Sequence, residues 1–326
     1  MILPYLLRLL CLCFASFFVL NAAVGVLVRL SSKSAIRFAP SRTSSTAARL
    51  LLAFRLLPLA IAVLFVAVLC VPSYLWLEPA ATAERVGLVC LLLGVLGAAI
   101  CFLSMARAVG SLVASVRHNR LCRLGGQKTR LLGNSSPIVL FEDEAPLLAL
   151  SGLLRPQLLI SRGVLRVLSA EELDAALRHE HAHHASRDNA KRLLLLLAPD
   201  IFPFVRAHRT LEHSWSKFAE WAADDQAAGG DSQRALSLAA ALVQVARMGS
   251  VPRLPVLTTS LLAGDKDLAA RVDRLLCAEP MVVPRTSKAQ SRFSSAAFLL
   301  VVCLVAMLLA PSALSSVHEL LELLLH

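Results

Sequence analysis

The chain has 326 residues, 57% of them hydrophobic, and its mean hydropathy is +0.67. Apolar residues and glycine together usually make up about 45–50% of a soluble domain, so this composition argues against a soluble globular protein and predicts membrane-spanning helices. The net charge of +11 gathers on the flanks of apolar runs and forms no basic stripe on a soluble domain, so we expect no direct nucleic-acid partner.

Four apolar runs predict four transmembrane helices. Leu9–Val28, Val86–Met105 and Ala296–Leu314 have close to the about 20 residues that cross a bilayer, and the shorter run Leu56–Val71 can be extended on both sides. The first run exceeds the about 7–15 residues of a signal-peptide core and has no basic cluster before it, so we expect an uncleaved anchor. The predicted spans are about 9–28, 52–74, 86–105 and 296–314.

Basic residues orient these spans. Residues 29–55 carry six basic residues and no acid, and basic residues also follow the third run and precede the fourth. Because cytoplasmic flanks are enriched in Lys and Arg, we expect a multi-pass protein of the cell (inner or plasma) membrane, with anionic lipid beside its basic flanks. The predicted organisation is three spans in 1–105 with a basic cytoplasmic loop at 29–51, a cytoplasmic domain at 106–295, a fourth span at 296–314 and a short extracytoplasmic tail at 315–326.

The cytoplasmic part is predicted to be mainly helical with a small β-sheet. "PIVLFEDEAPLLALSG" contains two short β runs, Ile138–Phe141 and Leu147–Leu150, and "PQLLIS" at 156–161 is a candidate third. A helix begins after Ser169, which forms the pattern of a capping box with Glu172. Further amphipathic helices are predicted at about 205–228, 235–248 and 268–277.

The stretch "HEHAHHASRD" at 179–188 carries the strongest chemical signal. His179 and His183 are four residues apart and share a helix face, so both imidazoles can bind one metal ion, whereas His181 and His184 point elsewhere. Glu180 lies beside the pair, where it can take a proton from an attacking water. This is the HExxH pattern of zinc metallopeptidases, which predicts Zn²⁺ as the cofactor and Glu180 as the catalytic base.

A third protein ligand is expected, because catalytic zinc takes three protein ligands and keeps one position open. In "EWAAD" at 220–224, Glu220 and Asp224 share a helix face, so Glu220 would bind the metal and Asp224 would accept the ring N–H of His179. His213 is a rival ligand seven residues earlier, but Asp224 would then lie about 16 Å further along the helix, too far to reach the ring. His213 is instead a candidate for stabilising the substrate oxyanion.

Three segments carry a resemblance to a known family: "LLISRGVLRVLSAEELDAALRHEHAHHASRDN", "LEHSWSKFAEWAADD" and "RVDRLL" at 271–276. With three spans before the domain and one after it, they resemble the BlaR/MecR-type membrane zinc metallopeptidases over nearly the whole chain. The resemblance implies a gluzincin-like α+β metallopeptidase domain in which His179, His183 and Glu220 bind zinc. Asp224 and Asp188 are then expected to contact the ligand side chains without binding the metal themselves.

The chain departs from that family at two places. Trp221 and Ala223 stand where Tyr and Cys are usual, which bears on packing, and only residues 315–326 follow the last expected span, where the antibiotic sensors carry a penicillin-binding domain. The resemblance therefore implies a protease module that cleaves a protein or peptide substrate in signal transduction, with a transcriptional repressor as one candidate. An HtpX/CaaX-type quality-control protease and a non-proteolytic membrane scaffold stay open as alternatives.

Overall fold

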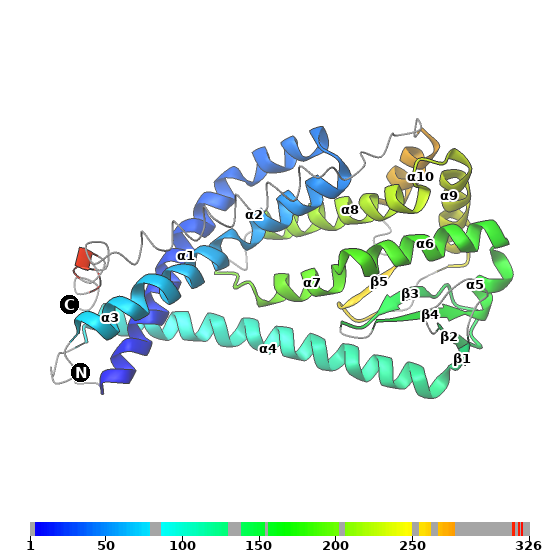
Figure 1. Ribbon diagram of the computed structural model, residues 1–326. Coiled ribbons are helices and arrows are strands. Elements are labelled where there is room, and N and C mark those ends of the chain that lie inside the picture. The colour runs from blue at the N-terminus through cyan, green and yellow to red at the C-terminus, as the bar shows by residue number, and fades with distance from the viewer. Residues whose placement is uncertain are drawn as a thin grey trace.

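The computed structural model describes residues 4–78, 86–129, 138–153, 156–201, 206–249, 254–261 and 267–277, together with 315, 316, 319 and 321. This part is mainly helical and contains a small mixed sheet. Its α-helices are α1 (Tyr5–Phe38), α2 (Ser44–Phe65), α3 (Val71–Leu77), α4 (Leu88–Gly125), α5 (Arg162–Val167), α6 (Ala170–Ser186), α7 (Asp188–Leu197), α8 (Arg206–Ala228), α9 (Ser232–Arg247) and α10 (Leu268–Leu276). Helices α1 to α4 extend toward one end of the molecule, and the sheet lies at the other end with α5 and α9 (Figure 1).

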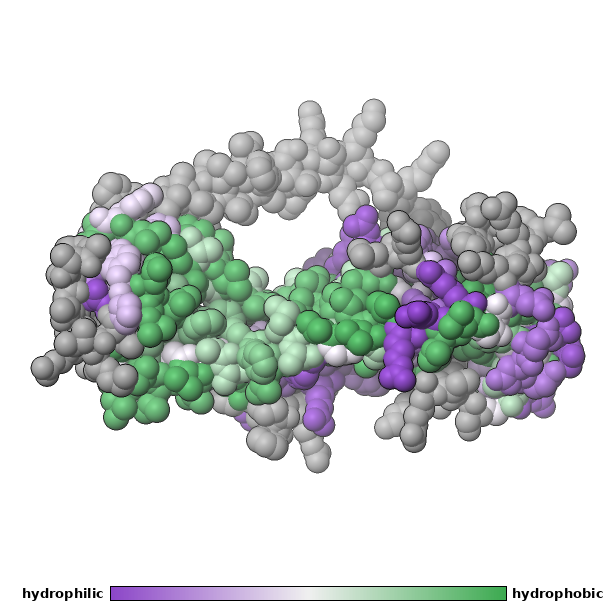
Figure 2. All heavy atoms as spheres, turned by 90° about the horizontal axis from the view of Figure 1, so that it is seen from below, coloured by the Kyte–Doolittle hydropathy of each residue, from purple (hydrophilic) through white to green (hydrophobic). Residues whose placement is uncertain are grey.

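Three helical segments are long and apolar enough to cross a membrane: Tyr5–Ser41, Ser44–Leu77 and Leu88–Gly125. The second combines α2 and α3 through a π-helical segment at Val66–Cys70. Large hydrophobic side chains are exposed along these segments, and the face seen in Figure 2 is hydrophobic toward the membrane helices and hydrophilic at the opposite end. The fourth predicted span, 296–314, lies outside the described residues.

The predicted loop at 29–51 is wrong as a description of the backbone, because most of these residues are helical. Helix α1 continues to Phe38, α2 begins at Ser44, and only a 3₁₀ turn at Ala39–Ser41 and two further residues separate them. Residues 29–38 contain neither Gly nor Pro, so nothing ends α1 before Pro40. With 34 residues, α1 is about 51 Å long against a hydrocarbon core of about 30 Å, so it extends well beyond a bilayer.

The sheet has the strand order β1-β2-β4-β3-β5. Its strands are β1 (Gln127–Thr129), β2 (Ile138–Phe141), β3 (Leu148–Ser151), β4 (Gln157–Ser161) and β5 (Thr258–Ser260). β2 pairs with β4 in parallel, and the other pairs are antiparallel. The three predicted strands are present, and β5, which the sequence did not indicate, joins the edge next to β3.

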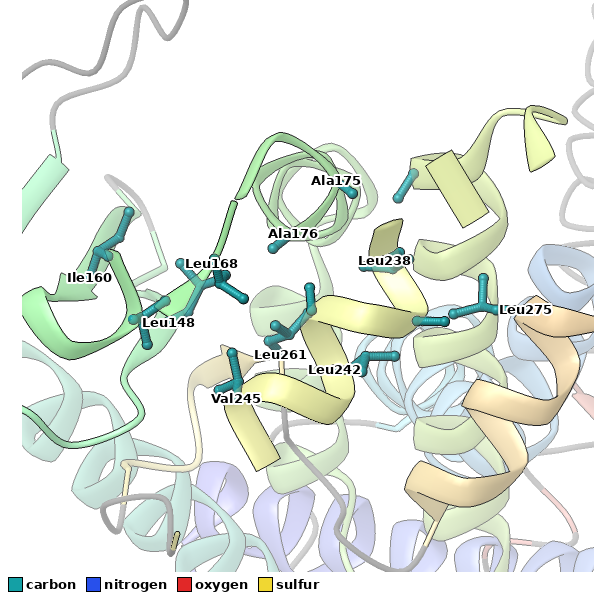
Figure 3. Close-up of a cluster of buried hydrophobic side chains, with 14 of the residues drawn as sticks. Leu148, Ile160, Leu168, Ala175, Ala176, Leu238, Leu242, Val245, Leu261 and Leu275 are labelled. Atoms are coloured by element: carbon teal, nitrogen blue, oxygen red, sulfur yellow. The ribbon is translucent and has the colours of Figure 1, made fainter. Parts of the chain in front are cut away.

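A buried apolar cluster joins the sheet to α6 and α9. Ala175 and Ala176 face it from α6, and their small side chains let the helix approach closely (Figure 3). α9 contributes Leu238 and Leu242, while Leu148 comes from the sheet. Because the HExxH stretch lies on the same helix one turn later, this packing fixes α6 and with it the position of the histidines.

Helices of the domain also pack directly on the membrane helices. Helix α8 lies along α2, and α7 packs on α4 (Figure 1). One buried cluster contains Leu211, Trp215 and Phe218 of α8 with Ala47, Ala48 and Leu51 of α2. The apolar end of α7 is in part buried here through Leu195. The helices that carry the candidate site are therefore held against the membrane helices.

Candidate metal centre

Helix α6 and the turn after it set the first half of the site. The predicted capping box is present, since Ser169 accepts from the Glu172 amide and the Glu172 carboxylate accepts from the Ser169 amide. The helix ends at Arg187, whose left-handed backbone (φ 54°) is uncommon for a residue with a side chain. This turn starts α7 at Asp188 and brings its carboxylate back to the ring of His183.

Three side chains converge on one point from α6 and α8. His179 Nε2 and His183 Nε2 are 3.2 Å apart, and Glu220 Oε2 lies 3.5 Å from each of these nitrogens. All three residues are buried, and together they form a group that could hold a metal ion. The exposed His181 and His184 lie outside this group, as their helical spacing predicted.

The two carboxylate oxygens of Glu220 lack hydrogen-bond donors among the described residues, which favours a cation beside them. Glu220 is 3% exposed. Its neighbouring cation is Arg271, whose Nη1 lies 3.3 Å from Oε2. A buried carboxylate without donors is costly, so two imidazole nitrogens and this carboxylate form a donor set that a divalent metal would complete.

Two aspartates contact the Nδ1 atoms of the two histidines, on the ring side away from the metal group. Asp188 Oδ2 lies 2.7 Å from His183 Nδ1, and Asp224 Oδ1 lies 3.0 Å from His179 Nδ1. A carboxylate at Nδ1 favours the proton there and leaves Nε2 with the lone pair that a metal binds. Lys191 donates to the other oxygen of Asp188 at 2.7 Å, so that carboxylate is itself fixed.

Arg271 is part of the site and was missed by the motif analysis. Its Nε and Nη2 donate to the two oxygens of Asp224 at 2.9 and 2.7 Å, and its Nη1 donates to the Leu261 carbonyl at 2.8 Å. The residue is 3% exposed. The available signal was a charged residue on the apolar side of a short amphipathic helix, α10, within the segment "RVDRLL".

Glu180 faces the same interior from the helix that carries the histidines. Thr259 of β5 donates to its Oε2 at 3.5 Å, and its Oε1 has no partner among the described residues. Burial raises the pKa of Glu180, and the nearby His179 and His183 offset this in part. A carboxylate with a raised pKa is suited to accept and then return a proton near neutral pH.

The charges of the cluster are strongly coupled. Burial lowers the pKa of His183, but the Glu220 carboxylate and the hydrogen bond with Asp188 outweigh burial and raise it to about 10. Burial acts to raise the pKa of Glu220, but His183 and His179 hold it well below its usual range. In the metal-free protein, a positive charge on the imidazoles thus takes the place where a metal cation fits.

The structure does not bring His213 to the metal group. Its side chain is 59% exposed, and its Nε2 lies 3.6 Å from Asp267 Oδ2. On α8 it is seven residues before Glu220, which is about 10 Å along the helix. The expectation that His213 stabilises a substrate oxyanion therefore finds no support in its position.

No family model, curated protein or solved structure matches the chain. What the protein does is therefore inferred from the chemistry of the buried cluster.

Proposed function

We propose that the protein is a membrane-embedded zinc endopeptidase that cleaves a protein substrate at the cytoplasmic face of the membrane. The observation that carries this proposal is the convergence of His179, His183 and Glu220 with Glu180 beside them. None of these four side chains belongs to the apolar core cluster, whose α6 members lie one turn earlier.

The spacing of the three donor atoms supports zinc as the metal. Zinc binds imidazole nitrogen and carboxylate oxygen at about 2.0–2.2 Å, and tetrahedral angles then separate neighbouring ligand atoms by about 3.3–3.4 Å. The three separations of 3.2, 3.5 and 3.5 Å surround that value. Three protein ligands leave one tetrahedral position open, as in catalytic rather than structural zinc sites.

Different side chains of the protein would have separate roles in peptide hydrolysis. A zinc ion held by His179, His183 and Glu220 would supply a Lewis acid for the scissile carbonyl and the attacking water. Glu180 takes the proton from the attacking water and delivers it to the leaving amine, and Thr259 holds one of its oxygens in place. Asp188 and Asp224 keep both ligand histidines oriented through the reaction.

An extended peptide is the form of substrate that we expect beside the sheet. Among the described residues, β5 pairs only with β3; its three residues are buried, and Thr259 contacts Glu180. An extended peptide can pair with an edge strand of a sheet through main-chain hydrogen bonds. The basic flanks of the spans favour a cytoplasmic domain, and the BlaR/MecR-type resemblance favours signal transduction, with a transcriptional repressor as one candidate substrate.

A quality-control protease of the HtpX/CaaX type is the alternative with the same chemistry. The described residues between His183 and Glu220 form α7 and the first part of α8, without a membrane hairpin, which favours the first assignment. A non-proteolytic scaffold would have no use for a base beside the metal group, and would not require stoichiometric zinc.

Glu180→Gln tests the proposal. The carboxamide keeps the shape of the site and the three ligands but cannot accept the proton, so zinc content should stay near one per chain while cleavage falls by a factor of about 10²–10⁴. The measurement compares protein fragments in cells carrying wild-type and variant protein, with metal analysis of both purified proteins. Glu171→Gln, the same change at an exposed position of α6, is the matched control. Fragments that persist unchanged in Glu180→Gln would reject the assignment.

A further inference from the structure

A polar cavity of about 230 Å³ lies at the junction between the membrane helices and the domain. Helices α2 and α4 line it from one side, and α7 and α8 line it from the other. A water molecule occupies about 30 Å³ in the liquid, so the cavity has room for more than one ordered water. Its charged and hydroxyl-bearing lining residues are Arg55, Arg107, Arg192, Asp200, Glu212 and Ser216.

Two of the three arginines in this cavity have no acidic partner among the described residues. Arg55 is buried and lies 3.0 Å from Glu212, so these two charges offset each other. Among the described residues, Arg107 donates one hydrogen bond, to the Ser104 hydroxyl at 3.4 Å, and the buried Nε of Arg192 donates none. Asp200, the second acidic residue of the lining, takes part in a separate interaction and pairs with neither of these two arginines. Because the buried Nε of Arg192 needs an acceptor, and because the exposed Arg107 adds a positive charge that no described carboxylate offsets, the lining favours an anionic guest.

The position of the cavity along the spans indicates where that guest comes from. Arg55 comes directly before the apolar run Leu56–Val71, and Arg107 follows the run Val86–Met105. Both arginines therefore stand where the hydrocarbon core of a bilayer ends and lipid headgroups begin. They also stand on the basic flank of the spans, the flank that faces the leaflet rich in anionic lipid.

We propose that this cavity binds the phosphate of an anionic phospholipid headgroup through Arg107 and Arg192. A guanidinium group matches phosphate oxygens in a paired geometry, and basic pockets between membrane helices are suited to such headgroups. Trp215 lines the same cavity, as expected of a tryptophan at the membrane interface. The site is separate from the metal centre and does not depend on the proposed protease activity.

The test uses the full-length protein in detergent with added phosphatidylglycerol, phosphatidylcholine or soluble glycerol phosphate. Thermal unfolding and native mass spectrometry report binding. We expect saturable stabilisation by phosphatidylglycerol with about one retained lipid per chain, and weaker stabilisation by phosphatidylcholine, whose choline cation opposes the arginines. The double variant Arg107→Gln, Arg192→Gln should weaken phosphatidylglycerol binding at least about tenfold.

The matched control is the double variant Arg117→Gln, Arg120→Gln, which makes the same charge change at exposed positions of α4 outside the cavity. It should bind like wild type. Equal weakening in both double variants would overturn the site and leave only general attraction to charged lipid. Equal stabilisation by glycerol phosphate would overturn the lipid assignment in favour of a soluble phosphate compound. If the cavity double variant fails to fold, the single change at the exposed Arg107 decides on the same criteria.

Discussion

Arg271 connects three parts of the metal centre through a single side chain. It holds both oxygens of Asp224, lies near Glu220 and donates to the carbonyl of Leu261 just beyond β5. Because Asp224 in turn contacts His179, the orientation of one ligand histidine depends on this arginine. We infer that Arg271 is a positioning residue for the site.

Arg271→Gln should therefore both destabilise the protein and weaken its hold on the metal. Removing one partner of a buried pair costs about 3–5 kcal/mol, because Asp224 is left buried without its cation. Denaturant unfolding and zinc affinity of the purified variant are the measurements. Arg274→Gln is the control, since Arg274 on the same helix contacts Asp225, Ser44 and Trp221 but none of the metal-group residues, so its loss should leave zinc affinity unchanged. Equal losses of zinc affinity in both variants would contradict the special role of Arg271.

Replacing Glu220 should remove metal, whereas replacing His213 should not. Glu220→Ala deletes one of three converging donors, so zinc content of the folded protein should fall well below one per chain. His213→Ala changes an exposed side chain beside Asp267, and near-full occupancy is expected. Metal analysis of both proteins, with far-UV circular dichroism to confirm folding, decides between the two. Metal loss in His213→Ala alone would mean that the third ligand has been misassigned.

The raised pKa of His183 should make zinc binding depend on pH. Without metal, the ring keeps its proton until pH rises through about 10, compared with an ordinary value of 6.5, and zinc requires the neutral ring. Zinc affinity should thus increase about tenfold per pH unit between about pH 7 and 9, with at least one proton released per metal bound. Titration calorimetry in buffers of different ionisation enthalpy measures that release.

The metal-free fold should respond to pH in the opposite direction. The protonated ring stabilises it fully below about pH 6.5, and this contribution is lost as pH rises through about 10. In the titration described above, zinc binding without proton release would contradict the protonated state of His183.

At this scale, local spacing predicted the residues that one helix turn brings together. His179, Glu180 and His183 follow from four-residue periodicity, and Glu220 followed from the number of ligands that catalytic zinc needs. The roles of Arg271 and Thr259 could not be predicted in this way. Their contacts with Asp224 and Glu180 span 47 and 79 residues, and no local pattern specifies such pairs.

Among the elements, the strands and helices with strong local signals were predicted and the weak ones were not. β5 has only three residues, and it becomes a strand because β3 pairs with it, 107 residues away at Ser151 and Thr258. The expected loop at 29–51 was inferred from charge, which reports the side of the membrane and not the backbone conformation. Helix α1 could continue through that segment because its serines and basic residues are compatible with a helix.

The contact between α1 and α4 depends on a glycine that has no room for a side chain. A Cβ built on Gly97 would lie 2.2 Å from the Phe14 carbonyl oxygen, which is backbone and cannot move aside cheaply. Small residues allow membrane helices to approach closely. Gly97→Ala should therefore separate α1 from α4 and lower the unfolding temperature in detergent by several degrees.

Gly25→Ala provides the control for that change. Nothing lies within 4 Å of a Cβ at Gly25, so alanine there should be neutral or slightly stabilising through its higher helix propensity. A loss of stability at Gly25 as large as that at Gly97 would show that α1 and α4 do not pack as described.

For the whole molecule, composition predicted a membrane protein, and three helices long enough to span a bilayer are present. Which side the domain occupies follows only from the basic flanks of these helices. The contact between the domain and the spans could not be predicted from the sequence. Helices α2 and α8 meet through apolar faces, and neither face has a pattern that identifies its partner. This contact holds helix α8, which carries Glu220, against α2.

The predicted topology can be tested with two thiols at opposite ends of the molecule. Cys277, which is natural and exposed, follows α10 in the domain, and Trp76, 67% exposed, lies near the end of α3. If the domain is cytoplasmic, a membrane-impermeant maleimide should modify Cys277 only after the cells are opened. A Trp76→Cys substitution in a Cys277→Ser background should be modified in intact cells, because that end of the span would face outward. The Cys277→Ser protein alone measures labelling of the thiols inside the spans. Modification of Cys277 in intact cells would place the domain outside, and the proposed cytoplasmic substrate would then be excluded.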